Sequence, residues 1–110
     1  MQRFGQIIEI KPEKLEAYKK YHCQVWPEVL ARIKKSNLRN YSVFYKDNLL
    51  FAYFEYTGND FKKDMEDMAN DPKTIEWWSI MDPMQKPIKP IVKRTGGEWW
   101  ANMEEVFHAD

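Results

Sequence analysis

The stretch that decides the fold is 38–57, LRNYSVFYKDNLLFAYFEYT. Its two halves, 38–46 and 49–57, are rich in β-branched and aromatic residues and predict two strands. Asp47 and Asn48 separate them, and because both residue types tolerate positive φ, they predict a tight turn and a hairpin. Both faces of the second strand are apolar or aromatic, so the sheet must be covered on both sides. We expect helices on one side, and a ligand, a partner subunit or both on the other.

Segments before the hairpin predict a strand and two helices. Phe4 to Ile10 alternates roughly between polar and apolar residues, as a strand does. Pro12 follows at a position typical of a first helical turn, and this helix should end near His22. A second helix should begin at Pro27, which cannot lie deep inside a helix, and should end near Ser36.

Segments after the hairpin complete the fold. Gly58-Asn59-Asp60 should end the strand and offer an N-cap for a helix, and Asn70-Asp71-Pro72 should end that helix and start another. Pro83 to Gly97 predicts an irregular stretch, and Glu98 to His108 predicts a closing strand. The resulting order β–α–β–β–α–β is typical of an α+β fold, the ferredoxin-like split β-α-β sandwich, with four strands and helices on one face.

Composition sets limits on class. The 110 residues suit one domain, 1–110, and 17 basic residues balance 17 acidic ones, which argues against a nucleic-acid or membrane-surface binder. Cys23 is the only cysteine, so no intramolecular disulfide forms and a reducing compartment is favoured. No apolar run has the length of a signal peptide core or a membrane span, so we expect a soluble cytoplasmic protein.

One constellation could carry chemistry. Tyr18 and His22 are four residues apart and would share a helix face. His22 would lie at the end of that helix, where the dipole favours the protonated ring and where acid–base chemistry is possible. A lone histidine on such a helix is more often only structural. The adjacent Trp77 and Trp78 would diverge by about 100° on a helix, so one can pack inward while the other reaches a pocket edge.

Other chemistries have little support. The sequence has no GxGxxG, Walker-type loop, GxSxG or CxxC motif, and His22, Cys23 and His108 lack a recognised zinc spacing, so we predict neither cofactor nor metal. The remaining histidine, tyrosines and tryptophans suit a sugar, because indole rings stack on its apolar faces and polar groups bind its hydroxyls. Ring opening of a sugar needs only proton transfer, which a histidine can provide near neutral pH.

The chain resembles the L-rhamnose mutarotases over nearly its whole length. The resemblance rests on Tyr18 and His22 followed by Val25-Trp26-Pro27-Glu28, on Asn40-Tyr41, on Trp77-Trp78 with Met81 behind them, and on Glu105-Val106-Phe107-His108. It implies a dimeric α/β barrel that interconverts the anomers of L-rhamnose, or of a close 6-deoxy or related aldose, without a cofactor. It further implies that His22 is the proton donor and that Tyr18, Tyr41, Trp77 and Trp78 bind the sugar. The family commonly has Asn-Pro after the histidine, where this chain has Cys23-Gln24.

Two alternatives remain open from the sequence. The first is a cofactor-free monooxygenase on the same dimeric barrel, because a fold does not fix a function. The second is a non-catalytic sugar-binding module, which would bind a sugar without accelerating anomer exchange. A homodimer through the open sheet face is expected in any of these cases.

Overall fold

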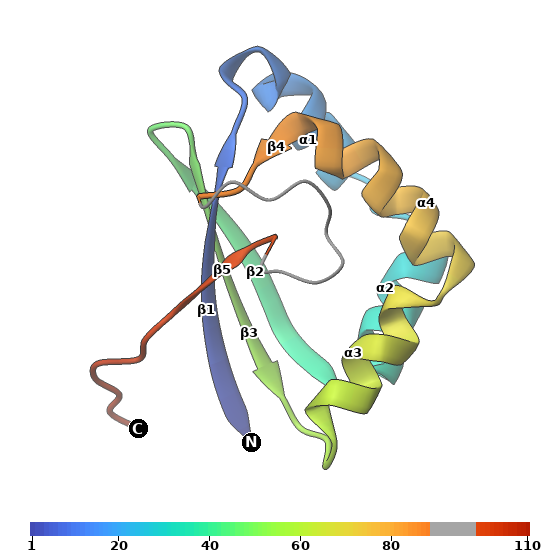
Figure 1. Cartoon of the computed structure of the whole chain (residues 1–110), viewed down its shortest axis with the longest axis vertical. Coiled ribbons are helices and arrows are strands. Elements are labelled where there is room, and N and C mark those ends of the chain that lie inside the picture. Colours follow the sequence, from blue (N-terminus) through green and yellow to red (C-terminus); the bar gives the residue numbers. More distant parts are fainter. Residues whose placement is uncertain (89–98) are drawn as a thin grey trace.

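The computed structural model describes residues 1–88 and 99–110. It shows a curved antiparallel sheet, and four helices cover one face of that sheet (Figure 1). The long strands are β1 (Gln2–Ile10), β2 (Leu38–Lys46) and β3 (Leu49–Tyr56), and the short ones are β4 (Gln85–Lys86) and β5 (Ala101–Met103). The helices are α1 (Leu15–His22), α2 (Pro27–Lys35), α3 (Phe61–Ala69) and α4 (Pro72–Met81), with 3₁₀ turns at Pro12–Lys14 and Asp82–Met84.

The strand order confirms the predicted fold class. The sheet runs β2-β3-β1-β4, and every neighbouring pair is antiparallel. This is the order of the split β-α-β arrangement, with the first strand in the middle of the sheet. Because β1 is central, residues from both ends of the described chain meet on it.

Local signals set the element boundaries as the sequence predicts. Asp47 and Asn48 have φ of 50° and 64° and form the hairpin turn. Pro27 and Pro72 stand in the first turns of α2 and α4, where a missing N–H costs no helical hydrogen bond. The Asp60 side chain caps α3 by accepting a hydrogen bond from the Lys63 backbone N–H at 3.2 Å.

A bulge in β2 determines where Tyr41 lies. The register shifts between Arg39 and Ser42, and Asn40 adopts a φ of 52°. The extra residue changes the phase of the strand. As a result, Leu38 before the bulge and Val43 after it both face the helices, and Tyr41 stacks over the buried Phe54.

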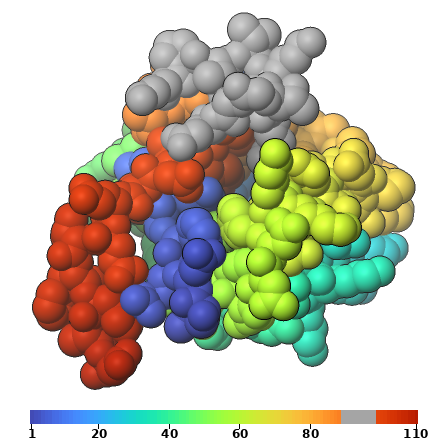
Figure 2. Space-filling model, turned by 60° about the horizontal axis from the view of Figure 1, so that its bottom comes forward, coloured from blue at the N-terminus to red at the C-terminus, as the bar shows by residue number. Residues whose placement is uncertain are grey.

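The predicted closing strand, Glu98 to His108, is wrong in its extent. Only Ala101–Met103 pairs with β1, whereas 104–110 forms neither helix nor strand, and Glu98 lies outside the described residues. The exposed tail is instead joined to β1 by an ion pair of Arg3 with Glu105 at 3.1 Å. In the space-filling view the C-terminal residues lie beside the N-terminal strand (Figure 2).

Part of the fourth strand lies within the predicted irregular stretch, Pro83 to Gly97. β4 pairs Gln85 with Ile10 and Lys86 with Glu9. Pro87 then follows, and its missing N–H cannot continue a ladder. An uninterrupted ladder would place Ile88 opposite Ile7, but Ala101 occupies that place, thirteen residues later. The remainder of the stretch, 89–97, lies outside the described residues.

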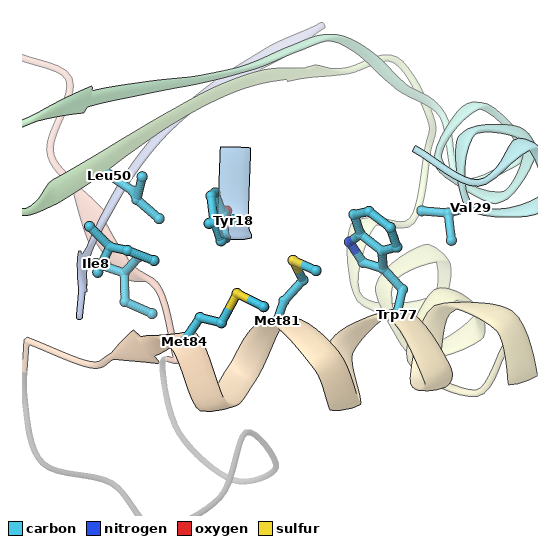
Figure 3. Close-up of a cluster of buried hydrophobic side chains, with 8 residues drawn as sticks. Ile8, Tyr18, Val29, Leu50, Trp77, Met81 and Met84 are labelled. Carbon is cyan, nitrogen blue, oxygen red and sulfur yellow. The ribbon is translucent and has the colours of Figure 1, made fainter. Parts of the chain in front are cut away.

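Two buried clusters fill the space between the sheet and the helices. The larger contains Ile8, Ile10, Tyr18, Val29, Leu50, Trp77, Met81 and Met84. Its side chains point toward one another from the sheet, α1, α2 and α4 (Figure 3). The smaller contains Leu38, Phe54 and Tyr56, with Phe4 and Phe61 packed against it.

None of the four helices in residues 1–88 and 99–110 lies on the other face of the sheet (Figure 1). Across this open face the register aligns an apolar row: Ala101, Ile7, Phe51 and Phe44. Phe44 is 63% exposed. Farther along the same face, Tyr53 and Asn40 donate hydrogen bonds to the Glu55 carboxylate at 2.6 and 2.8 Å. The open face is therefore apolar at one end and polar at the other.

Candidate active site

His22 is fixed by the end of the helix that carries it. Its Nδ1 lies 2.8 Å from the backbone carbonyl oxygen of Tyr18, one turn earlier in α1. A carbonyl can only accept, so Nδ1 must carry a hydrogen in this arrangement. In the neutral ring, Nε2 is then the nitrogen that holds a lone pair and can exchange a proton.

Aromatic rings enclose His22 on two sides. The Tyr18 ring is stacked on it with centroids 4.2 Å apart, and the Trp77 ring meets it edge-on at 5.4 Å. Trp26 packs on Trp77 in turn, at 5.1 Å. Tyr18 and His22 thus share the helix face that their spacing predicts. The contacts of Trp77 with His22 and Trp26 join α1 and the turn after it to α4.

This environment reverses the expected effect on His22 protonation. The sequence predicts a protonated ring favoured by the helix dipole, but burial lowers the pKa of His22 below its usual value of 6.5. The hydrogen bond to the Tyr18 carbonyl acts in the opposite direction and is the smaller effect. Desolvation prevails because the ring lies among apolar aromatics, which stabilise the neutral form.

Trp77 and Trp78 have different surroundings, as their helical spacing predicts. Trp77 is 6% exposed and belongs to the larger core cluster, whereas Trp78 is half-buried at its border. Trp77 therefore contributes to the core and also contacts the His22 ring. Trp78 has the more accessible indole.

A buried glutamine that was not predicted from the sequence supports the site. Gln85 is 4% exposed; its Nε2 donates to the Tyr18 hydroxyl at 3.3 Å, and its Oε1 accepts from Trp99 Nε1 at 2.8 Å. Buried amides need such partners. The glutamine lies two residues before Pro87 in a stretch without periodicity, so no local signal marks it. Only its pairing with Ile10 of β1 brings it within hydrogen-bonding distance of the Tyr18 hydroxyl.

Among the described residues, the ring contact of Tyr41 is with Phe54, not with His22, Tyr18 or Trp77. It stacks on Phe54 at 5.3 Å, in line with Phe4 and Phe61 at the smaller cluster. It does lie on the side of the sheet that the helices cover, as His22 and the tryptophans do. The predicted site residues are thus divided between two clusters that face the same space.

The described residues contain neither a cluster of metal ligands nor a membrane-spanning helix. Across 1–88 and 99–110, no three His, Cys, Asp or Glu side chains gather as metal ligands would. None of the helices in this part of the chain combines the length and apolar character needed to cross a bilayer.

Comparison with known proteins gives a consistent family. The model of the L-rhamnose mutarotase family matches residues 3–109. The L-rhamnose mutarotase of Oceanobacillus iheyensis is 32% identical over 112 residues and that of Lactiplantibacillus plantarum 29% identical over 112, each alignment covering both chains entirely.

Solved structures share the fold. An L-rhamnose mutarotase from Formosa agariphila superposes with a TM-score of 0.76 at 24% identity, and a tetracenomycin F2 cyclase from Streptomyces glaucescens with 0.66 at 13%. Both alignments cover all of each chain. At these identities, the likeness concerns the architecture alone.

Proposed function

This chain belongs to the L-rhamnose mutarotase family, and from that premise we propose that it interconverts the α and β anomers of L-rhamnose or a closely related aldose. The observation that carries the proposal is the enclosed His22, with Nδ1 engaged by the Tyr18 carbonyl and with aromatic rings around it. Membership of the family indicates which reaction to expect. The geometry indicates that the His22 imidazole is suited to transfer the proton in that reaction.

Ring opening moves one proton from the anomeric hydroxyl to the ring oxygen while the bond from the anomeric carbon to that oxygen breaks. We assign donation to the ring oxygen to protonated His22 through Nε2, because Nδ1 is held by the Tyr18 carbonyl, and solvent water accepts the proton that leaves the anomeric hydroxyl. The lowered pKa makes the protonated imidazole a stronger acid than a free histidine. After the aldehyde end rotates, the reverse transfers close the ring as the other anomer.

Aromatic side chains would bind the sugar. Trp78, half-buried beside the core, and Tyr41, 40% exposed over Phe54, offer ring surface to an apolar sugar face. Tyr18 and Trp77 contact His22 directly, so they would hold the imidazole in orientation as well as meet the sugar. The fixed Tyr18 hydroxyl beside Gln85 adds a polar group to this region.

We also propose a homodimer through the open sheet face. The apolar row that ends at Phe44 crosses four strands, and Met103 adds a side chain that is 42% exposed. Contiguous exposed apolar surface of this kind is typical of protein–protein contacts. A second copy of the sheet offers the same row in return, as a two-fold interface requires.

Saturation-transfer NMR of anomer exchange tests the function directly. One anomeric proton is saturated, and transfer to the other anomer is measured with and without protein across a panel of aldoses. We expect acceleration for L-rhamnose or a close relative. Sugar-dependent tryptophan fluorescence without acceleration would instead indicate a binding module, and acceleration of no sugar in the panel would contradict the proposal.

A further inference from the structure

A polar residue, Gln6, lies at the centre of the helix-covered side of β1. Side chains alternate along a strand, so β1 directs Phe4, Gln6 and Ile8 to the same side. Ile8 is fully buried under the helices, which identifies this side (Figure 3). The facing residues on β3 are apolar: Leu50, Ala52 and Phe54. Gln6 therefore interrupts an apolar surface where one more aliphatic side chain would fit the pattern.

Gln6 lies in the gap between the two core clusters. Its neighbours in the register are Ala52 on β3 and Asn102 on β5. Ala52 is buried but belongs to neither cluster, and its side chain is too short to bridge them. On one side of this row lies the cluster with Tyr18, and on the other lies Phe54, over which Tyr41 stacks. Gln6 thus stands between the two groups that hold the predicted site residues.

The glutamine is oriented but retains hydrogen-bonding capacity. Its Nε2 donates to Asn102 Oδ1 at 2.9 Å, and this is the side-chain hydrogen bond that Gln6 makes within the described part of the chain. A glutamine amide has a second N–H and an oxygen that accepts. Gln6 is half-buried and Asn102 is exposed, so this amide group is accessible on a side where the flanking Ile8 and Ala52 are not.

We propose that Gln6 binds sugar hydroxyls away from the anomeric centre, with Asn102 as a positioning residue that orients its amide. This deepens the proposed function and rests on it. An amide can donate to one hydroxyl and accept from another, as neighbouring ring hydroxyls require. Gln6 is two residues, about 6.6 Å of strand, from Ile8, which packs in the cluster with Tyr18. His22 would therefore act at the anomeric end of the sugar ring, while Gln6 forms hydrogen bonds with hydroxyls at the other end of that ring.

Gln6→Met tests this proposal, with Gln2→Met as the matched control. Gln2 is also a glutamine of β1 and faces the same side of the sheet as Gln6, but it is exposed at the end of the strand. For Gln6→Met we expect KM for L-rhamnose to rise roughly two- to tenfold, as the loss of one hydrogen bond implies, with kcat nearly unchanged. Gln2→Met should leave both constants unchanged.

Deoxy sugars identify the hydroxyl concerned. A rhamnose analogue that lacks the bound hydroxyl should have a raised KM with the wild type and no further rise with Gln6→Met. Asn102→Ala should raise KM by a smaller factor, and combining it with Gln6→Met should add nothing. Because Asn102 lies at the exposed edge, this variant gives the same readout even if Gln6→Met folds poorly.

The outcomes separate the two proposals. If the wild type accelerates exchange while Gln6→Met and Asn102→Ala keep the wild-type KM on every sugar, the role of Gln6 is overturned and the mutarotase function stands. A fall in melting temperature with no change in KM has the same meaning, since a structural role alone would produce it. If the wild type accelerates the exchange of no sugar, the mutarotase proposal fails and the Gln6 proposal fails with it.

Discussion

The two faces of the sheet differ in how they use aromatic side chains. On the covered face, Phe54 packs in the smaller buried cluster, and Tyr18 and Trp77 from the helices above the sheet contact the titratable ring of His22. On the open face, Phe44 and Phe51 form part of an apolar row that no described element covers. Alternate residues of the same strands face the two sides of the sheet. The proposed site and the proposed association surface therefore lie on opposite sides of one sheet.

The two ends of the open face differ in whether their side chains have partners within the described part of the chain. Glu55 accepts hydrogen bonds from Tyr53 and Asn40, which hold the pKa of its carboxyl below the usual range. Its charge is therefore satisfied within one subunit. The row that ends at Phe44 has no comparable partner in the described part of the chain, and burial against a second copy would remove it from water.

The largest expected effect comes from removing the titratable ring on the covered face. His22→Asn keeps a polar group but cannot donate a proton, so catalysed anomer exchange should fall about 10²–10⁴-fold, the usual contribution of one general acid. Sugar binding, followed by tryptophan fluorescence, should largely survive. A folded variant that binds sugar and exchanges anomers at the wild-type rate would make His22 structural.

The next largest effect should distinguish the two indoles of the covered face. Trp77→Ala should lower the free energy of unfolding by about 3–5 kcal/mol, because a large buried ring leaves a cavity. Trp78→Ala should cost less, since its indole is only half-buried, and should mainly weaken sugar binding. Denaturant unfolding and sugar titration measure the two quantities. Equal losses of stability would contradict the division of roles.

A smaller effect should appear on the open face. Phe44→Asp should weaken the proposed dimer about ten- to a hundredfold, since burial of a phenylalanine contributes about 1.5–3 kcal/mol. Sedimentation across a concentration series measures the shift. Ile75→Asp is the matched control, because Ile75 is 49% exposed on α4, away from this face. A wild-type protein that is only monomeric at micromolar concentration would refute the dimer.

The smallest effect is a pH dependence that only the covered face should produce. The pKa of His22 lies below 6.5, so the ring is mostly neutral at pH 7 and becomes the proton-donating form as pH falls. The enzyme-dependent rate should therefore increase severalfold from pH 7.5 to 5.5. His22→Asn should lose this increase. A catalysed rate that instead decreases through this range would assign His22 the role of base.

Local patterns were sufficient for most of the fold. The Asp47-Asn48 turn, the break before Pro27 and an N-cap within Gly58-Asn59-Asp60 depend on neighbouring residues, and the sequence predicts each of them. The fourth strand is interrupted because two separate segments, β4 and β5, pair with β1. This pairing joins residues far apart in the sequence, so a local hydrophobic pattern cannot predict it. The candidate site also has a part that local spacing predicts and a part that it does not. Helical spacing predicts Tyr18 beside His22, but it does not predict the contact of Gln85 with Tyr18.

The pKa of His22 was not predictable for the same reason. The helix end is visible in the sequence, whereas the desolvation that outweighs it comes from Trp77, fifty-five residues later in the chain. The role of Tyr41 likewise depends on the bulge at Asn40, whose positive φ has no clear signature beyond the residue type.

The pairing of β5 with β1 has a kinetic consequence. Gln6 and Asn102, whose side chains meet in the sheet, are separated by 96 positions in the chain, whereas the β2–β3 hairpin closes over two. Contacts of large sequence separation close long loops and tend to slow folding. The hairpin can therefore form early, and the edge that carries Asn102 should join last. During refolding, native-like tryptophan packing should precede the recovery of full sugar affinity.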